Sequence, residues 1–307
     1  MAGASGQGDP ERLQMRLKDG RAFGLATYGD PRGLPVLALH GAPASRLMFD
    51  VADQAARGAG LKLYCPDRPG YGLTPPDAQP SLASRAQLIE AIADHLGLER
   101  LALLGVSGGA PYAVALANRL GPRVAAMALV SPMGPIADMA AADSAAVVRD
   151  IPKGQRWFFM QLPKRRAGLR ALAAAAARGF HAGPTLAARG FARLLSPADT
   201  EILSRPEYEA SLIRMTREAL RQGSGGGVAD LRIYSQPWGV DFAAVRTPAV
   251  LWQGTADRIV PRAAALWLGK ALPQCQVEEI AGAGHFWVYA NTARILRRLA
   301  QLAAAKG

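Results

Sequence analysis

Short, almost wholly apolar runs recur along this chain and alternate with segments of helical periodicity. The runs are residues 35–39, 61–65, 101–106, 124–130 and 249–252. Such runs are typical of parallel strands that are buried on both faces of a sheet. Two earlier strand candidates, 13–17 and 21–28, are joined by Asp19-Gly20 as in a hairpin, and residues 276–280 alternate as in an edge strand. We therefore predict a mainly parallel, eight-stranded sheet.

Helices are predicted where apolar positions recur with a period near 3.6. The segments are 81–96, 110–120, 263–272 and 286–305. Gly97, Gly121 and Pro273 directly follow the first three segments, and these residue types commonly end helices. Because strands and helices alternate, we expect an α/β fold whose sheet is flanked by helices on both faces.

The alternation stops after Ser131 and resumes at Thr247. Residues 134–236 show helical segments and several prolines but no strand pattern. An insertion at this point would lie over the carboxyl edge of the sheet, where ligands bind in such folds. We expect a core domain of residues 1–133 and 237–307 and a helical cap of residues 134–236. Near its end, the glycines 225–227 lack the context of a phosphate-binding loop and are interpreted as a flexible hinge.

The net charge of +12 changes this picture little. Residues 134–236 hold 15 Lys/Arg and 9 Asp/Glu and so carry half of the excess. A solvated helix face explains it most simply, and an attraction for anionic substrates or surfaces is the alternative. Since no nucleic-acid motif accompanies the charge, we expect a small-molecule substrate and no nucleic-acid partner. The oligomeric state is left open.

Several features favour a cytoplasmic protein. Residues 1–12 are small and polar and lack the apolar stretch of a secretory signal. No segment approaches the roughly 20 apolar residues that span a bilayer, so no membrane span is expected. Cys65 and Cys275 lie far apart without a Cys-x-x-Cys neighbour and are interpreted as buried, reduced thiols.

Gly105-Val106-Ser107-Gly108-Gly109 is the only G-x-S-x-G in the sequence. The motif ends one predicted strand and opens the next predicted helix, which is the context of a nucleophile elbow. At such a turn the serine takes a strained backbone conformation. The residues two before and two after it approach so closely that a Cβ would clash, which explains Gly105 and Gly109.

A serine hydroxyl needs an adjacent base, usually a histidine that a carboxylate holds in the right tautomer. Among the four histidines, His285 lies in a glycine-rich turn between the last strand and the last helix, and we predict that it is the base. His95 and His181 are interpreted as surface or packing residues. His40 ends a strand and suits a loop-positioning role.

The acid is predicted to be Asp257, which follows the strand at 249–252 and a turn, 28 residues before the histidine. The chain order is then Ser, Asp, His, which is one of the orders in which such triads occur. Asp138, which follows the preceding strand, and Asp230 and Asp241, which flank the exit of the insertion, are rival candidates.

An oxyanion hole needs two N–H groups that are already in place. We expect one from Gly108, the residue after the serine, and the second from the loop His40-Gly41-Ala42-Pro43. Ala42 is the choice in this loop, because Pro43 has no N–H and Gly41 is explained by the tight turn. The alternative is that His40-Gly41 is only a turn that ends a strand.

Five motifs together resemble the α/β-hydrolase superfamily, in its capped branch. They are His40-Gly41, Asp67-Arg68-Pro69-Gly70-Tyr71-Gly72, the Ser107 elbow, residues 254–261 and Gly284-His285-Phe286. The match spans about residues 20–299, and the insertion resembles the family only in position and helical character. The resemblance implies acyl-enzyme chemistry on an ester-like bond and structural roles for Asp67 and Arg68. A serine at the elbow departs from the superfamily's dehalogenases and epoxide hydrolases, which have an aspartate there.

The sequence thus predicts a serine hydrolase that cleaves a small, hydrophobic ester or related acyl bond. Proton abstraction by a lyase or a cofactor-free oxygenase is one alternative, and a non-catalytic binding protein on the same fold is the other. No cofactor or metal is expected, because the histidines are scattered and no dinucleotide fingerprint is present. Candidate pocket residues are Met48, Phe49, Met133, Trp157, Phe158, Phe159, Met160 and Trp238.

Overall fold

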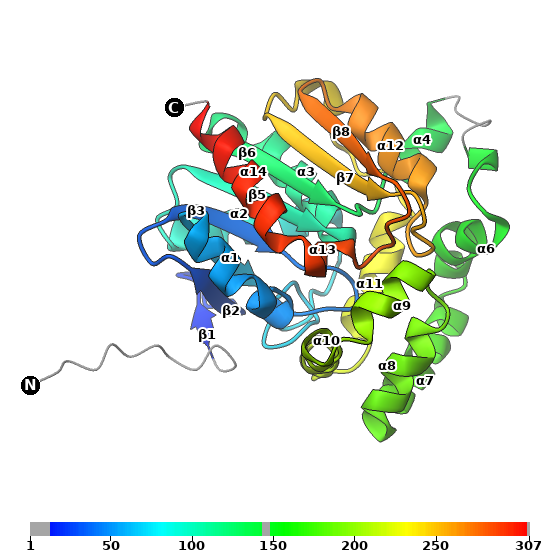
Figure 1. Cartoon of the computed structure of the whole chain (residues 1–307). Helices are drawn as coiled ribbons and strands as arrows, with labels where there is room; N and C mark the ends of the chain where they lie inside the picture. The colour runs from blue at the N-terminus through cyan, green and yellow to red at the C-terminus, as the bar shows by residue number, and fades with distance from the viewer. Residues whose placement is uncertain (1–12, 143–147, 306–307) are drawn as a thin grey trace, which may run out of the picture.

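The computed structural model describes residues 13–142 and 148–305 and is built around one eight-stranded sheet (Figure 1). The strand order is β1-β2-β4-β3-β5-β6-β7-β8. The strands are β1 (Gln14–Arg16), β2 (Ala22–Gly29), β3 (Leu34–Leu39), β4 (Leu61–Pro66), β5 (Leu101–Val106), β6 (Val124–Val130), β7 (Ala249–Gly254) and β8 (Cys275–Ile280). Only the pairs β1–β2 and β2–β4 are antiparallel. The predicted mainly parallel, eight-stranded sheet is confirmed.

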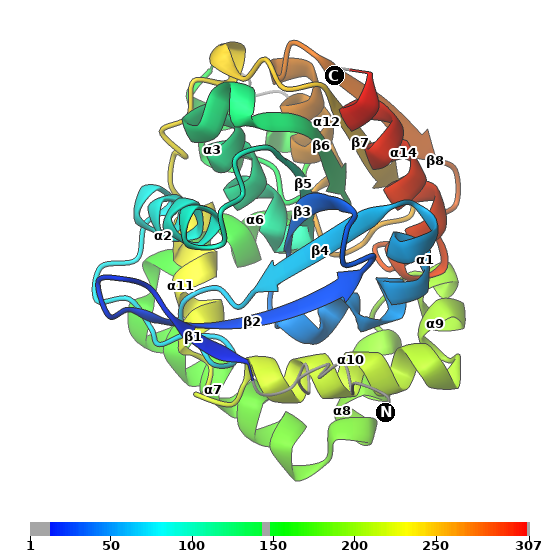
Figure 2. The same cartoon turned by 90° about the vertical axis from the view of Figure 1, so that its left-hand side faces the viewer.

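Alternate residues of the central strands pack into two separate cores, one on each face of the sheet. Val36 and Ala38 of β3 belong to the core beneath α1 (Asp53–Gly58) and α14 (Thr292–Ala304). Leu37 and Leu39 belong to the core on the other face. That face is covered by α2 (Leu82–His95), α3 (Ala110–Leu120) and α12 (Arg262–Ala271) (Figures 1 and 2). Because both faces are buried, the strand sequences are continuously apolar.

The predicted helices agree with the observed ones except at the C-terminal end. The segment 286–305 is predicted as one helix, but it forms α13 (Trp287–Ala290) and α14, separated at Asn291. Asn291 has φ −129°, which is far from a helical value. The break lets α13 stay beside the turn that carries His285 while α14 packs against the sheet.

Helices occupy the described part of the insertion, residues 134–142 and 148–236, and no strand is found there. The α-helices are α4 (Ile136–Ala141), α6 (Lys153–Arg156), α7 (Arg166–Ala182), α8 (Pro184–Ala192), α9 (Pro197–Leu203), α10 (Pro206–Ala219) and α11 (Gly225–Tyr234). Prolines begin α8, α9 and α10, at the first position, where a missing N–H costs nothing. Figures 1 and 2 show α7 to α10 gathered on one side of the molecule, away from α2 and α3.

The hinge predicted at residues 225–227 is wrong, because these glycines form the first turn of α11. At this point the backbone of α11 approaches the loop after β4. A Cβ on Gly226 would lie 2.7 Å from the carbonyl oxygen of Gly70 and 2.9 Å from the ring of Tyr71. The small residue therefore serves a close contact rather than chain flexibility.

Both cysteines lie in strands and are not paired with each other. Cys65 is fully buried in β4, as predicted, whereas Cys275 at the start of the edge strand β8 is partly exposed. Across residues 13–142 and 148–305, no helix combines the length and the apolar character needed to cross a bilayer.

Candidate active site

Ser107 stands at the end of β5 and begins the single turn η2 (Ser107–Gly109), which leads into α3. Its φ is 53°, a region that non-glycine residues rarely adopt. A Cβ on Gly105 would lie 2.8 Å from the Cα of Ala110, and one on Gly109 would overlap the carbonyl of Leu39. The predicted strain at the serine and the predicted need for both glycines are confirmed.

The structure brings Ser107, His285 and Asp257 together although they come from three separate loops. His285 Nδ1 lies 2.8 Å from Asp257 Oδ2, and Nε2 lies 3.0 Å from Ser107 Oγ. Because a carboxylate can only accept, Nδ1–H donates to Asp257, which leaves Nε2 to accept the hydroxyl proton of the serine. Ser107 is 8% exposed and His285 6%, so both are largely shielded from water.

Asp257 is held in place by the loop that follows β7. Its Oδ1 accepts from the backbone N–H groups of Ile259 at 2.8 Å and Val260 at 3.1 Å. Its Oδ2 also accepts from the amide of Gln253 at 3.2 Å. These donors leave the carboxylate little freedom to rotate away from the imidazole.

Two opposing effects act on the pKa of His285. Burial lowers it, because the charged imidazolium loses solvation, but the facing carboxylates of Asp257 and Asp199 outweigh burial and hold the pKa above its usual value. The site therefore favours the imidazolium that forms when His285 takes a proton.

The other histidines and the rival acids have different partners. His95 packs edge-on against Phe23, and His181 is exposed on α7 beside Phe180. Asp138 accepts from the backbone N–H of Trp238 at 3.0 Å. Asp241 accepts from the N–H of Ala243 at 3.1 Å and caps a short turn. Asp230 lies in a separate buried cluster.

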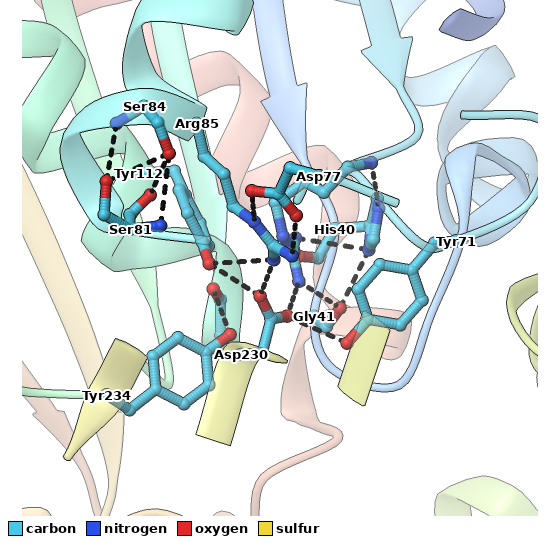
Figure 3. Close-up of polar contacts among 12 residues, drawn as sticks. His40, Gly41, Tyr71, Asp77, Ser81, Ser84, Arg85, Tyr112, Asp230 and Tyr234 are labelled. Carbon is cyan, nitrogen blue, oxygen red and sulfur yellow. Dashed lines mark hydrogen bonds and ion pairs between the residues drawn. The ribbon is translucent and has the colours of Figure 1, made fainter. Parts of the chain in front are cut away.

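The Asp230 cluster joins α11 to the core, and Figure 3 shows its polar contacts. The carboxylate accepts from Arg68 Nη2 (2.6 Å), Arg85 Nη1 (2.5 Å), Tyr71 Oη (2.8 Å) and Tyr112 Oη (2.6 Å). Burial raises the pKa of Asp230, but Arg68 and Arg85 outweigh it and lower the pKa to about 2. Asp230 is therefore charged at neutral pH and pairs with two buried arginines.

The cluster also reaches the loop that carries Ala42. Arg68 Nη2 donates to the carbonyl of Gly41 at 3.0 Å, and Arg68 Nη1 donates to the carbonyl of His40. Because C=O and N–H point in opposite directions across a trans peptide, holding the Gly41 carbonyl also fixes the direction of the Ala42 N–H. His40 is buried here, and burial together with Arg68 puts its pKa well below the usual value.

Gly108 and Ala42, the predicted oxyanion donors, are neighbours in the structure. A Cβ on Gly108 would lie 3.1 Å from the Cβ of Ala42. Tyr234, one helical turn after Asp230 on α11, donates its hydroxyl to the Gly108 carbonyl at 2.8 Å. Burial raises the pKa of Tyr234 well above its usual value, so this hydroxyl keeps its proton.

Asp67 also makes a buried ion pair. The family resemblance implies a structural role for this residue, as it does for Arg68. Its carboxylate accepts from Arg46 Nη1 and from the Arg46 backbone N–H, both at 2.7 Å. Arg46 in turn donates to Glu218 of α10 at 2.7 Å. The contact joins α10 to the loop after β4.

A cavity of about 1050 Å³ opens between the insertion and the loop after β7. Phe158 and Phe159, two of the predicted pocket residues, line it together with Phe191, Asp257, Ile259 and Trp267. The others lie elsewhere: Met48, Phe49, Met133 and Trp238 are buried in the cores, Met160 packs against a core, and Trp157 is exposed. Of the three residues Ser107, His285 and Asp257, only Asp257 borders the cavity.

Asp199 of α9 is a residue at this site that the sequence reasoning missed. Its carboxylate accepts from the backbone N–H of Phe286, the residue after His285, at 2.6 Å. No motif surrounds it in the sequence, so only the fold reveals the contact. In the described residues 13–142 and 148–305, no group of three or more His, Cys, Asp or Glu side chains could hold a metal ion.

Comparisons with known proteins agree with this fold. The solved structure of an α/β-hydrolase fold protein from Nakamurella multipartita is similar with a TM-score of 0.69 at 20% identity, covering 96% of this chain and 99% of that one. A thermophilic esterase from Thermogutta terrifontis is similar with a TM-score of 0.70 at 20% identity and the same coverage.

A curated relative also matches part of the sequence. It is the uncharacterized hydrolase YcgS of Bacillus subtilis, which is 30% identical over 120 residues, or 39% of this chain. The match spans only 41% of the length of that relative. The family model described as the alpha/beta hydrolase family matches residues 36–298, which include Ser107, Asp257 and His285. This chain therefore belongs to the alpha/beta hydrolase family.

Proposed function

We propose that the protein is a serine hydrolase that cleaves a small, hydrophobic ester or related acyl bond through an acyl-enzyme. Ser107 is the nucleophile, His285 the general base and acid, and Asp257 the carboxylate that orients the imidazole. The observation that carries the proposal is the continuous relay from Ser107 Oγ through His285 to Asp257, with distances of 3.0 and 2.8 Å.

The chemistry takes place in two halves. Ser107 Oγ attacks the substrate carbonyl while its proton moves to His285 Nε2, and the resulting oxyanion accepts from the N–H groups of Gly108 and Ala42. The imidazolium then gives this proton to the leaving group, and the acyl group stays on Ser107. His285 then deprotonates a water molecule that attacks the acyl-enzyme, and it returns the proton to Ser107 Oγ as the acid is released.

The substrate class rests on the surroundings of the site. The cavity that borders Asp257, although not Ser107 or His285, is lined by more apolar and aromatic than charged side chains, which is consistent with a hydrophobic substrate. In this proposal residues 134–236 act as a cap over the site, and the reaction takes place on a small molecule in the cytoplasm. The esterase from Thermogutta terrifontis shares the fold, which is consistent with the proposal.

Hydrolysis of short p-nitrophenyl esters tests the proposal. Wild type should release p-nitrophenol, with an initial burst for esters whose acyl-enzyme is hydrolysed more slowly than it forms. Ser107→Ala should reduce kcat by about 10⁴-fold or more, since the nucleophile is lost. Ser204→Ala, an exposed serine of the insertion, is the matched control and should behave as wild type.

Undiminished ester hydrolysis by Ser107→Ala would contradict the assignment. Turnover that disappears in this variant, while intact-protein mass shows no acyl group on wild type during the reaction, would favour proton abstraction over acyl transfer. A folded wild type that neither hydrolyses esters nor forms an acyl-enzyme would point to a binding protein.

A further inference from the structure

Asp199 is a fully buried carboxylate that the proposed mechanism does not use. Its side chain is 0% exposed, although it belongs to the inserted segment rather than to the sheet. Oδ1 accepts from the Phe286 N–H at 2.6 Å, and Oδ2 accepts from the Ser196 hydroxyl at 2.8 Å. Burying a charged carboxylate costs desolvation free energy, so we asked what Asp199 contributes at this position.

The turn that carries His285 is shaped to receive this carboxylate. A Cβ added to Gly284 would overlap the carboxyl group of Asp199, and all three of its nearest atoms would belong to that group. Gly284 does not have a positive φ, so its backbone would accept an alanine. An alanine before His285 would therefore force the Asp199 carboxyl group to move.

Asp199 also acts on His285 through its charge. Asp257, from the loop after β7, and Asp199, from α9, are the two charged groups that raise the pKa of the imidazole against the effect of burial. Ser107, on the remaining side, is neutral. In residues 13–142 and 148–305, the hydrogen bonds to the Asp199 carboxylate come from Ser196 and the Phe286 N–H, and none comes from an arginine or a lysine.

We propose that Asp199 is a positioning residue for His285. Through Asp199, the insertion holds the turn of residues 284–286 in place and, together with Asp257, stabilises the imidazolium. This role rests on the proposed function, because it matters to catalysis only if His285 exchanges a proton with Ser107. It makes the insertion part of the acid–base machinery and not only a cover for the substrate.

The direct test is an NMR titration of the His285 imidazole in wild type and in Asp199→Asn. Asparagine keeps the shape of the side chain and an acceptor for the Phe286 N–H but removes the charge. The titration midpoint of His285 should fall in this variant. The His285 midpoint should stay unchanged in Asp241→Asn, which removes the same charge from an aspartate that caps a short turn elsewhere. The His285 signal is identified by its absence from His285→Gln.

The pH dependence of ester hydrolysis gives a second readout. General-base catalysis needs neutral His285, so the acidic limb of kcat/KM follows its pKa and should shift to lower pH in Asp199→Asn. At higher pH kcat should fall on the order of tenfold, because the imidazolium formed in the reaction loses one of its two stabilising charges.

Gly284→Ala tests the same contact from the other side. The added methyl group should displace the carboxylate of Asp199 and lower the His285 midpoint in the same direction. In an Asp199→Ala background the same glycine substitution should cost little more, because the atoms that it would overlap are gone.

An unchanged His285 midpoint in folded Asp199→Asn would overturn the inference, even if activity fell. Fully additive effects of Asp199→Ala and Gly284→Ala would also contradict it. If wild type does not hydrolyse esters, the proposed function fails, and the titration still decides whether Asp199 acts on His285.

Discussion

Two aspartates of the insertion, Asp199 and Asp230, are fully buried, and their surroundings are opposite in kind. Both side chains are 0% exposed. Asp230 faces two arginines and two tyrosine hydroxyls, which supply charge balance and hydrogen bonds together. In the part of the chain that the structure describes, Asp199 accepts from a serine hydroxyl and a backbone N–H, and its charge acts on His285.

The contact of Asp230 with its arginines stabilises the fold, whereas the interaction of Asp199 with His285 changes when the imidazole gains a proton. A carboxylate between permanent cations has the same partners at every stage of a reaction, so it fixes geometry. A carboxylate beside a titratable imidazole interacts more strongly when the imidazole gains a proton, which is the change that a general base undergoes. The insertion thus supports the Ala42 loop, because Asp230 holds Arg68, and it also supplies the Asp199 charge that acts on His285.

The largest effect on stability is expected from Asp230→Asn. Two buried arginines would lose their common counter-charge, and breaking a buried pair typically costs about 3–5 kcal/mol in the free energy of unfolding. Urea denaturation measures this loss, with exposed Asp241→Asn as the control. A cost below about 1 kcal/mol would show that the Asp230 cluster does not anchor α11.

Acid should weaken the same cluster in wild type. The pKa of Asp230 is lowered to about 2 in the folded protein, below its ordinary value of 3.8. Its contribution to stability is therefore present above about pH 4 and is lost as the pH falls toward 2, and it amounts to about 2 kcal/mol. Unfolding free energies measured between pH 5 and pH 2.5 should fall less steeply in Asp230→Asn than in wild type, and parallel curves would contradict the assignment.

The smallest effect is expected from Ser196→Ala. Ser196 Oγ donates to Asp199 Oδ2 at 2.8 Å and accepts from the Asp199 N–H at 3.2 Å, which caps α9. Loss of such a cap costs about 1 kcal/mol. Because the charge of Asp199 remains, the pH profile of ester hydrolysis should keep its midpoint, whereas a shift as large as that of Asp199→Asn would show that geometry matters more than charge.

The sequence predicted the sheet and the positions of Ser107, His285 and Asp257 relative to it. It could do so because buried parallel strands are continuously apolar and because the ends of such strands meet at one edge. The glycines around Ser107 were interpretable because they belong to a recognisable motif, although the contact that requires Gly109 is with Leu39, 70 residues earlier.

The role of the insertion could not be predicted in this way. Asp199 lies 86 residues before His285, and Asp230 lies 162 residues after Arg68, with no motif around either acid. The glycines at the start of α11 were misread as a hinge because their reason, the contact of Gly226 with Gly70, is a tertiary contact. The break at Asn291 was missed because the apolar period continues across it.

The central claim is that Ser107 is activated by His285 and Asp257, and intact-protein mass after exposure to a fluorophosphonate tests it most directly. Wild type should gain the mass of one adduct, Ser107→Ala none, and Asp257→Asn should react far more slowly because its imidazole loses its orienting carboxylate. Folded wild type that gains no adduct, or an adduct that persists in Ser107→Ala, would contradict the account.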